Sequence, residues 1–221
     1  MAHLNFISGI HKATTRDYLA RVLEADKAEC AEISKRFGRE YFDGDRKHGY
    51  GGFKYDGRWV PFAQRLIAHY GLRPGMRVLD IGCAKGFVLH DLRAELPGLE
   101  IAGLEISEYA IANAMEDVRP FLNLGTAADL SAYPDKSFDL ILSINTLHNL
   151  LLPQLFTALR EIERVARGGK FIVMDSYRNE REKVNLMYWQ LTCECFFRPE
   201  EWEFIFQQTR YTGDYDFVCF E

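Results

Sequence analysis

Short apolar runs alternate with amphipathic segments from residue 76 onward. Each run has the composition of a buried strand, and the segment after it has the period of a helix. The pattern predicts strands at 76–81, 100–105, 121–124, 138–144 and 170–175, and helices at 86–95, 107–117 and 153–166. Ser107 is well placed as the N-cap of the helix at 107–117. Strands that alternate with helices in this way require right-handed crossovers. The predicted fold class is therefore α/β, with a doubly wound and mostly parallel sheet.

The chain on either side of this alternation is predicted to be mainly helical. The expected elements are helices at 14–37, 61–70, 180–195 and 199–208 and a final strand at 215–220. Thr14 and Asp17 resemble a capping pair at the start of the first helix. We divide the chain into an N-terminal helical and loop extension, residues 1–60, and a main domain, residues 61–221.

The segment 41–59 is predicted to be a long irregular loop. It is dense in aromatic, glycine and charged residues and follows neither the helical nor the strand period. Such segments are usually functional or disordered, and the aromatic content argues against disorder. One interpretation is a lid in which Tyr50, Tyr55 and Trp59 close over a ligand and exclude water. The other is a loop packed by its own aromatic side chains.

The strongest functional signal is the stretch from 78 to 86, which reads VLDIGCAKG. An apolar run ends in Asp80, and a turn spaced by Gly82 and Gly86 opens directly into an amphipathic segment. This geometry brings backbone N–H groups and a helix N-terminus close to a bound cofactor. About twenty residues further on, a second apolar run ends in Glu105, whose carboxylate can accept hydrogen bonds from ribose hydroxyls. Together the two elements predict an adenosine-containing cofactor.

Composition narrows the setting. The chain has 221 residues, of which 48% are hydrophobic, and this is enough for one domain with a substantial core. A net charge of −5 disfavours a broad nucleic-acid-binding surface. The five cysteines are odd in number and lack paired spacing, so a reduced setting is expected, and no Cys or His pattern predicts a metal site. With neither a charged leader nor a long apolar run, we expect a cytoplasmic protein without a membrane span.

Five segments between Val78 and Asp175 occur together: VLDIGCAKG, GLEIS, AADL, FDLILSINTLHNL and RGGKFIVMD. In order and spacing, the series resembles the class I S-adenosylmethionine-dependent methyltransferases. Each segment is weak evidence alone, whereas five in register are strong. The resemblance implies a Rossmann-like methyltransferase fold, S-adenosyl-L-methionine as the cofactor, and methyltransferase activity.

The resemblance also implies roles for individual residues. The turn after Asp80 would hold the methionine part of the cofactor, Glu105 the ribose and Asp129 the adenine. Asn145, which follows the strand 138–144, would face both the methionine moiety and the substrate. The full set of expected cofactor-binding residues is Asp80, Gly82, Cys83, Gly86, Glu105, Ile106, Ala128, Asp129 and Asn145.

Two departures from the family pattern carry expectations of their own. The middle position of the turn is often glycine in the family and is Ala84 here, which is tolerable if its φ is negative. Only about ten residues follow the last predicted helix. We therefore expect a shortened sheet edge, or an abbreviated final hairpin, in place of the last two strands of the fold.

Two other functions stay open at this point. An NAD(P)-dependent oxidoreductase shares the Gly-rich turn and the ribose acid, and Tyr50 and Lys54 have the Tyr-x-x-x-Lys spacing of short-chain dehydrogenases. In those enzymes the pair lies on a later helix, so we interpret the spacing as a coincidence. The second alternative is a non-catalytic module that binds S-adenosylmethionine.

The expected chemistry is displacement of a methyl group by an in-line nucleophile. A neutral hydroxyl or amine acceptor benefits from a base, and the candidate is His148, near Asn145; the alternative is a packing or capping histidine. Tyr177 and Arg178 follow the strand 170–175 and are expected to contact substrate at the same sheet edge. A surface salt bridge is the alternative for Arg178.

The acceptor is expected to be a small molecule, with oxygen as the nucleophile. The family members that methylate amino groups of nucleic acids and glutamine carry an Asn/Asp-Pro-Pro-Tyr box after the fourth strand. Here the corresponding residues are Ile144-Asn145-Thr146-Leu147. Together with the acidic net charge, this argues against a nucleic-acid substrate.

Overall fold

A six-stranded sheet forms the centre of the computed structural model, which describes residues 1–12 and 16–221. Its strands are β1 (Arg77–Ile81), β2 (Glu100–Glu105), β3 (Leu122–Leu124), β4 (Phe138–Ile144), β5 (Ala166–Ser176) and β6 (Asp214–Cys219). They are hydrogen-bonded in the order β3-β2-β1-β4-β5-β6, and every neighbouring pair is parallel. The strand order reverses between β1 and β4, as in other doubly wound sheets. The prediction of a Rossmann-like α/β fold is confirmed.

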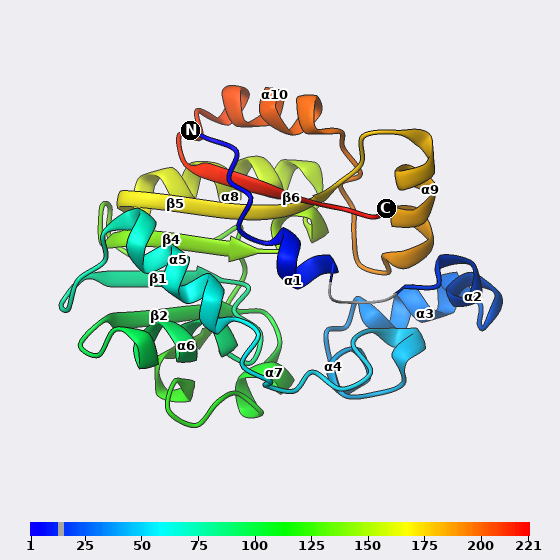
Figure 1. Ribbon diagram of the computed structural model, residues 1–221, viewed down its shortest axis with the longest axis horizontal. Coiled ribbons are helices and arrows are strands. Elements are labelled where there is room, and N and C mark those ends of the chain that lie inside the picture. Colours follow the sequence, from blue (N-terminus) through cyan, green and yellow to red (C-terminus); the bar gives the residue numbers. More distant parts are fainter. Residues whose placement is uncertain (13–15) are drawn as a thin grey trace.

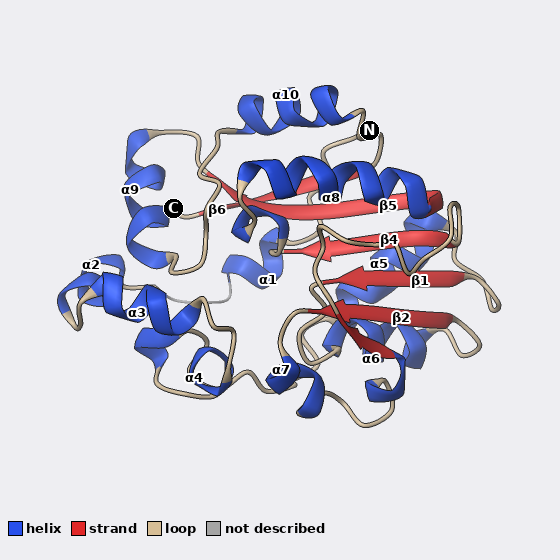
Figure 2. Ribbon diagram, turned by 180° about the vertical axis from the view of Figure 1, so that it is seen from behind, coloured by secondary structure: helices blue, strands red, loops and turns tan. Residues whose placement is uncertain are grey.

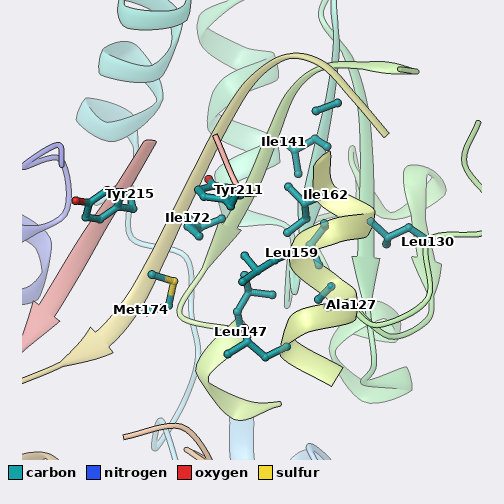
Figure 3. Close-up of a cluster of buried hydrophobic side chains, with 14 of the residues drawn as sticks. Ala127, Leu130, Ile141, Leu147, Leu159, Ile162, Ile172, Met174, Tyr211 and Tyr215 are labelled. Carbon is teal, nitrogen blue, oxygen red and sulfur yellow. The ribbon is translucent and has the colours of Figure 1, made fainter. Parts of the chain in front are cut away.

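Helices cover both faces of this sheet (Figures 1 and 2). The helices of the two layers are α5 (Val60–Tyr70) and α6 (Phe87–Glu95) on one face, and α8 (Leu152–Val165) and α10 (Pro199–Thr209) on the other. Figure 3 shows the cluster on the second face, in which Leu159 and Ile162 of α8 pack with Ile141 and Ile172 of the sheet. Burial of each such side chain stabilises the fold by about 1.5–3 kcal/mol.

The sheet ends in a single parallel strand. β6 pairs with β5 along its whole length. The first residues of the chain lie along the outer side of β6: the N–H of Tyr215 donates to the carbonyl of Ala2 at 3.0 Å, and the N–H of Leu4 donates to the carbonyl of Tyr215 at 2.8 Å. Of the two expected alternatives, the shortened edge is observed and the hairpin is wrong, because N-terminal residues take the next position in the sheet.

The helix predicted at 14–37 is divided. Its described part forms α2 (Tyr18–Leu23) and α3 (Lys27–Ser34), whereas Thr14 lies outside the described residues. Asp17 caps α2 by accepting the N–H of Ala20 at 2.9 Å, and Asp26 caps α3 by accepting the N–H of Ala28 at 2.8 Å. The second cap starts a new helix inside a continuous apolar pattern, so periodicity alone misses the break. Further short helices are α1 (Ser8–Lys12), α4 (Arg39–Phe42), η1 (Arg46–His48), η2 (Arg119–Phe121) and η3 (Leu147–Asn149).

Three other boundaries differ from the prediction. α7 (Glu108–Ala112) is shorter than 107–117, although Ser107 caps it as expected. α9 (Glu180–Trp189) ends before residue 195. β5 begins directly after α8, so Gly168 lies in the strand, where a Cβ would collide with the backbone of β4.

The N-terminal helices α2, α3 and α4 lie together with α9 beyond the carboxyl ends of the strands (Figure 1). α2 contacts α9 directly. Throughout the described part of the chain, no helix has both the length and the apolar character needed to cross a membrane.

Candidate functional site

A cavity of about 450 Å³ opens at the carboxyl ends of β1, β4 and β5. Asp80, Ile144 and Asp175, from the ends of these three strands, line it. Trp189 at the end of α9 and residues of α1, α2 and η1 contribute further walls. Ligands of open α/β sheets bind at this edge, where the strand order reverses. The cavity is therefore the candidate active site.

The turn between β1 and α6 forms one wall. Gly82 and Gly86 have φ values of 78° and 76°, in the left-handed region that favours glycine. A Cβ at Gly82 would also collide with Thr146, and a Cβ at Gly86 with Val118. Backbone conformation and packing thus require both glycines. Gly82 and Cys83 line the cavity, whereas Gly86 is the N-cap of α6.

The condition under which Ala84 would be tolerated without strain, a negative φ, is not met. Its φ is 50°, and for a residue with a Cβ this conformation costs about 1–2 kcal/mol. The N–H of Ala84 donates to Oε2 of Glu105 at 2.8 Å. This hydrogen bond, made to an acid at the end of the neighbouring strand, stabilises the strained turn.

Asp80 is a buried acid without a complete set of partners. It is 3% exposed and lines the cavity, and its Oδ1 has no hydrogen-bond partner among the described residues. Burial, with a smaller contribution from Glu105, raises the pKa of Asp80 to about 7. An unsatisfied carboxylate oxygen at a cavity wall is suited to a donor group of a ligand, such as an amino group.

Glu105 lies beside the turn, not in the cavity wall. Its Oε1 accepts the N–H of Ser107 at 2.9 Å. Burial raises the pKa of Glu105, and its backbone hydrogen bonds oppose this shift. Ile106 is 57% exposed, and Asp129 is exposed and accepts the N–H of Ser131 at 3.0 Å. The expected adenosine-binding residues therefore lie along the sheet edge, from the cavity toward β3. They are Glu105, Ile106, Ala128 and Asp129.

Asn145 directly follows β4 and lines the cavity, as expected. Its φ is 53°, a left-handed conformation that asparagine tolerates better than most residues. The N–H of Asn145 donates to the carbonyl of Val173 in β5 at 2.9 Å, which fixes this conformation at the strand end.

His148 and Asp175 form a buried polar pair in the cavity wall. They are 1% exposed each, and His148 Nε2 lies 3.4 Å from Asp175 Oδ2. The backbone N–H of Asp175 donates to His148 Nδ1 at 3.1 Å, so the proton of the neutral imidazole is on Nε2 and faces the carboxylate. Burial lowers the pKa of His148 and raises that of Asp175. Gln190 donates a further hydrogen bond to Oδ2 of Asp175.

The aromatic residues of the segment 41–59 divide into two groups. Tyr50 and Trp59 line the cavity. Tyr55 lies outside its wall and donates its hydroxyl to Asp91 at 2.5 Å, a hydrogen bond that raises the pKa of Tyr55 to about 12. The segment therefore contributes to the site through only part of the expected set.

Tyr177 and Arg178 are not among the described residues that line the cavity, so their expected contact with substrate is not supported. Tyr177 is 5% exposed, and the guanidinium of Arg198 lies over its ring at 5.5 Å. Arg178 forms ion pairs with Glu182 at 2.6 Å and Glu221 at 2.7 Å, which corresponds to the salt-bridge alternative.

Several cavity residues carry no signal in the sequence. Arg16, Arg21 and Arg46 line the cavity from segments that are far from β1, β4 and β5 in the chain. Asp175 ends a predicted strand, which is a weak signal, but its pairing with His148 depends on contact between neighbouring strand ends. Only the tertiary arrangement identifies the three arginines and pairs Asp175 with His148.

Comparison with known proteins agrees with this geometry. The family model described as a methyltransferase domain matches residues 72–212. A demethylmenaquinone methyltransferase of Tropheryma whipplei is 30% identical over 161 residues, which are 72% of this chain and 64% of the relative. A 27-O-demethylrifamycin SV methyltransferase of Amycolatopsis mediterranei is 32% identical over 119 residues, covering 50% of this chain and 42% of the relative.

A solved structure is also similar. The S-adenosylmethionine-dependent methyltransferase of Archaeoglobus fulgidus has a TM-score of 0.53 and 27% identity, with 66% of each chain covered. The chain spans between about one third and two thirds of the length of the relatives that it matches. With the family match over most of the sheet, these likenesses lead to one conclusion: the chain belongs to the class I S-adenosylmethionine-dependent methyltransferases.

Proposed function

We propose that the protein transfers a methyl group from S-adenosyl-L-methionine to an oxygen atom of a small molecule bound in the cavity. The observation that carries this proposal is that Asp80, with its unpartnered Oδ1, and the His148–Asp175 pair line the same cavity. Asp80 is suited to binding the cofactor, and the His148–Asp175 pair is suited to an acceptor that must lose a proton. The rifamycin relative, named for a 27-O position, supports oxygen as the acceptor.

The cofactor would be held by residues at the ends of β1 and β2. Asp80 would accept hydrogen bonds from the amino group, and Glu105 would accept them from the ribose while it holds the turn. The N-terminus of α6 has no side-chain cap, so its N–H groups and positive dipole end favour a carboxylate. Ile106, Ala128 and Asp129 would contact the adenine. When bound, S-adenosylmethionine supplies a methyl group that is activated by a sulfonium.

Proton transfer would fall to the buried pair. The imidazole of His148 already carries its proton on Nε2 and accepts the N–H of Asp175 on Nδ1, so neither nitrogen is available as a base. The Asp175 carboxylate lines the cavity, and burial raises its pKa toward the range in which a carboxylate accepts a proton effectively. Asp175 would therefore receive the acceptor proton, and His148 would orient the carboxylate. This differs from the role expected of His148 from the sequence.

The segment 41–59 would act as the lid over this reaction. Tyr50 and Trp59 line the cavity, and Ser107 at the sheet edge donates to the carbonyl of Phe37 at 2.5 Å. Exclusion of water by such a cover strengthens the electrostatic interactions inside the site. We propose that residues 1–60 form this extension and that residues 61–221 form the catalytic domain.

Calorimetric titration with S-adenosylmethionine, S-adenosylhomocysteine, NADH and NADPH tests the cofactor. We expect binding of the two sulfur compounds only; binding of a nicotinamide would contradict the proposal. Glu105→Ala should weaken S-adenosylhomocysteine binding at least about tenfold. The matched control Glu108→Ala alters an exposed acid of α7 and should have no effect. Release of S-adenosylhomocysteine with a panel of phenols and alcohols then distinguishes an enzyme from a non-catalytic binding module.

A further inference from the structure

Three arginines surround one tryptophan in the cavity wall. The guanidinium carbons of Arg16, Arg21 and Arg46 lie 5.3, 4.6 and 5.1 Å from the ring centre of Trp189. All four residues line the cavity. The aromatic face attracts and orients the planar cations, so a concentrated positive charge is held at one end of the site.

Backbone carbonyl groups position these guanidinium groups. Arg21 donates to the carbonyls of Trp189 and Arg46, both at 2.9 Å. Arg46 donates to the carbonyls of Gly49 at 3.1 Å and Tyr50 at 2.7 Å. Within the described ranges, no carboxylate forms an ion pair with Arg21 or Arg46. Carbonyl groups fix the direction of a guanidinium without neutralising its charge.

The cluster is electrostatically unfavourable by itself. Burial lowers the pKa of all three arginines, and Arg46 lowers that of Arg21 further. Lys27 donates to the carbonyl of Tyr188 at 3.3 Å, and burial, followed by the charge of Arg21, lowers its pKa to about 8. An anion bound between these groups would relieve their mutual repulsion.

A fourth arginine in the same cavity shows a different arrangement. Arg58 lines the wall but is neutralised by Asp56, to which it donates at 2.6 Å. The charge of Arg21 and Arg46, which have no carboxylate partner among the described residues, is therefore at the side formed by Trp189. The next residue, Gln190, hydrogen-bonds to Asp175, so this side adjoins the proposed proton acceptor.

We propose that Arg21 and Arg46 bind an oxyanion group of the methyl acceptor, so that the substrate is an anionic small molecule. This inference rests on the proposed function, because it assigns the class of substrate to the same site. The guanidinium fork matches carboxylate and phosphate oxygens equally well, and the shared chemistry is an oxyanion bound by two-point hydrogen bonds. Anchored there, the acceptor would direct its neutral end toward Asp175.

Calorimetric titration with 4-hydroxybenzoate, 4-hydroxybenzamide and phenyl phosphate tests the charge requirement. The first two have the same shape and differ in charge, and the third distinguishes phosphate from carboxylate. We expect 4-hydroxybenzoate or phenyl phosphate to bind at least about tenfold more tightly than the amide. Two results would overturn the inference. One is equal affinity for the acid and the amide together with no binding of phenyl phosphate. The other is no binding of either anion.

Arg21→Gln and Arg46→Gln should each weaken binding of the anion about tenfold. Arg46 is the safer variant for folding because it is the most exposed of the three arginines. Arg58→Gln is the matched control and should retain the affinity; an equal loss in all three variants would contradict a specific site. The Arg21→Gln and Arg46→Gln variants should keep their affinity for S-adenosylhomocysteine. Titration of the wild type separates the two proposals: cofactor binding without anion binding rejects only this inference, whereas anion binding without cofactor binding rejects the proposed function.

Discussion

Lys85, in the turn after β1, donates a 2.6 Å hydrogen bond to Oδ2 of Asp43 in the N-terminal extension. Lys85 is only 7% exposed and also donates to the carbonyl of Phe53 at 3.0 Å. Tyr109 donates to the same oxygen of Asp43 at 2.8 Å. Burial acts to raise the pKa of Asp43, but the hydrogen bonds from Lys85 and Tyr109 lower it overall. The proposed lid is thus joined to the proposed cofactor turn by a charged contact.

Asp43→Asn should loosen this connection. The substitution leaves the buried ammonium of Lys85 without its charged partner, at a cost of about 1–3 kcal/mol. We expect faster proteolytic cleavage within 41–59 and weaker binding of S-adenosylhomocysteine, measured by limited proteolysis and calorimetry. Asp135→Asn, at an exposed acid that pairs with Arg164, is the control. Cleavage rates equal to the wild type would show that the contact does not hold the segment.

Asp80→Asn should stabilise the protein without cofactor at high pH. Because the folded pKa of Asp80 is raised to about 7, the folded state binds more protons than the unfolded state between about pH 4 and 7, and stability falls as the pH rises through this window. The full penalty, up to about 4 kcal/mol, is present above pH 7. Denaturant unfolding at several pH values should show this slope in the wild type and not in the variant. Cofactor binding should weaken in the same variant.

Asp139→Asn should change the stability of the protein in the direction opposite to Asp80→Asn. Hydrogen bonds from Arg167 and Arg77 lower the pKa of Asp139, with the contact to Arg167 as the largest contribution. Asp139 therefore stabilises the fold above its unfolded pKa, and this stability is lost as the pH falls. The substitution should destabilise the protein at neutral pH, opposite to Asp80→Asn. The same direction of change in both variants would contradict the assignment for Asp80.

Ala84→Gly should raise the stability. Glycine adopts a φ of 50° without the strain caused by a Cβ, and relief of this strain stabilises the folded state by about 1–2 kcal/mol. The greater conformational freedom of glycine in the unfolded chain opposes this gain by about 0.4–1 kcal/mol. The net gain of up to about 1 kcal/mol should appear as a higher melting temperature. Ala110→Gly, in helix α7, should lower it. A lower melting temperature in both variants would mean that the turn relaxes when it binds no ligand.

His148→Gln should reduce kcat by about two orders of magnitude and leave S-adenosylhomocysteine binding intact, because the side chain orients Asp175 but is remote from the turn. The acid limb of the pH–rate profile should remain in this variant, since it belongs to Asp175. If His148 were the base, the limb would disappear. Loss of cofactor binding as well would indicate a purely structural histidine.

Strand and helix periods predicted the sheet and the place of the site at its carboxyl edge, because both follow from local sequence. Ser107 was predicted as a cap for the same reason. The conformation of Ala84 was not predicted, because a hydrogen bond to Glu105 on a neighbouring strand stabilises it. The tautomer of His148 likewise depends on the N–H of Asp175, 27 residues away in the chain.

The arginine cluster was beyond prediction for a different reason. Arg16, Arg21 and Arg46 belong to segments whose expected roles were a plain helix and a loop. They meet only at Trp189, which comes from an element more than a hundred residues later. Side-chain groups that converge from unconnected segments leave no spacing in the sequence.

The hydrogen bonds between residues 2–4 and Tyr215 set an order for assembly during synthesis. Residues 2–4 find their sheet partner only when β6 has been made. Ile7 and Ile10, which follow this contact and line the cavity, cannot take their final positions before then. The nascent chain can form the turn after β1 early, but the closed binding site requires that β6 has also been made.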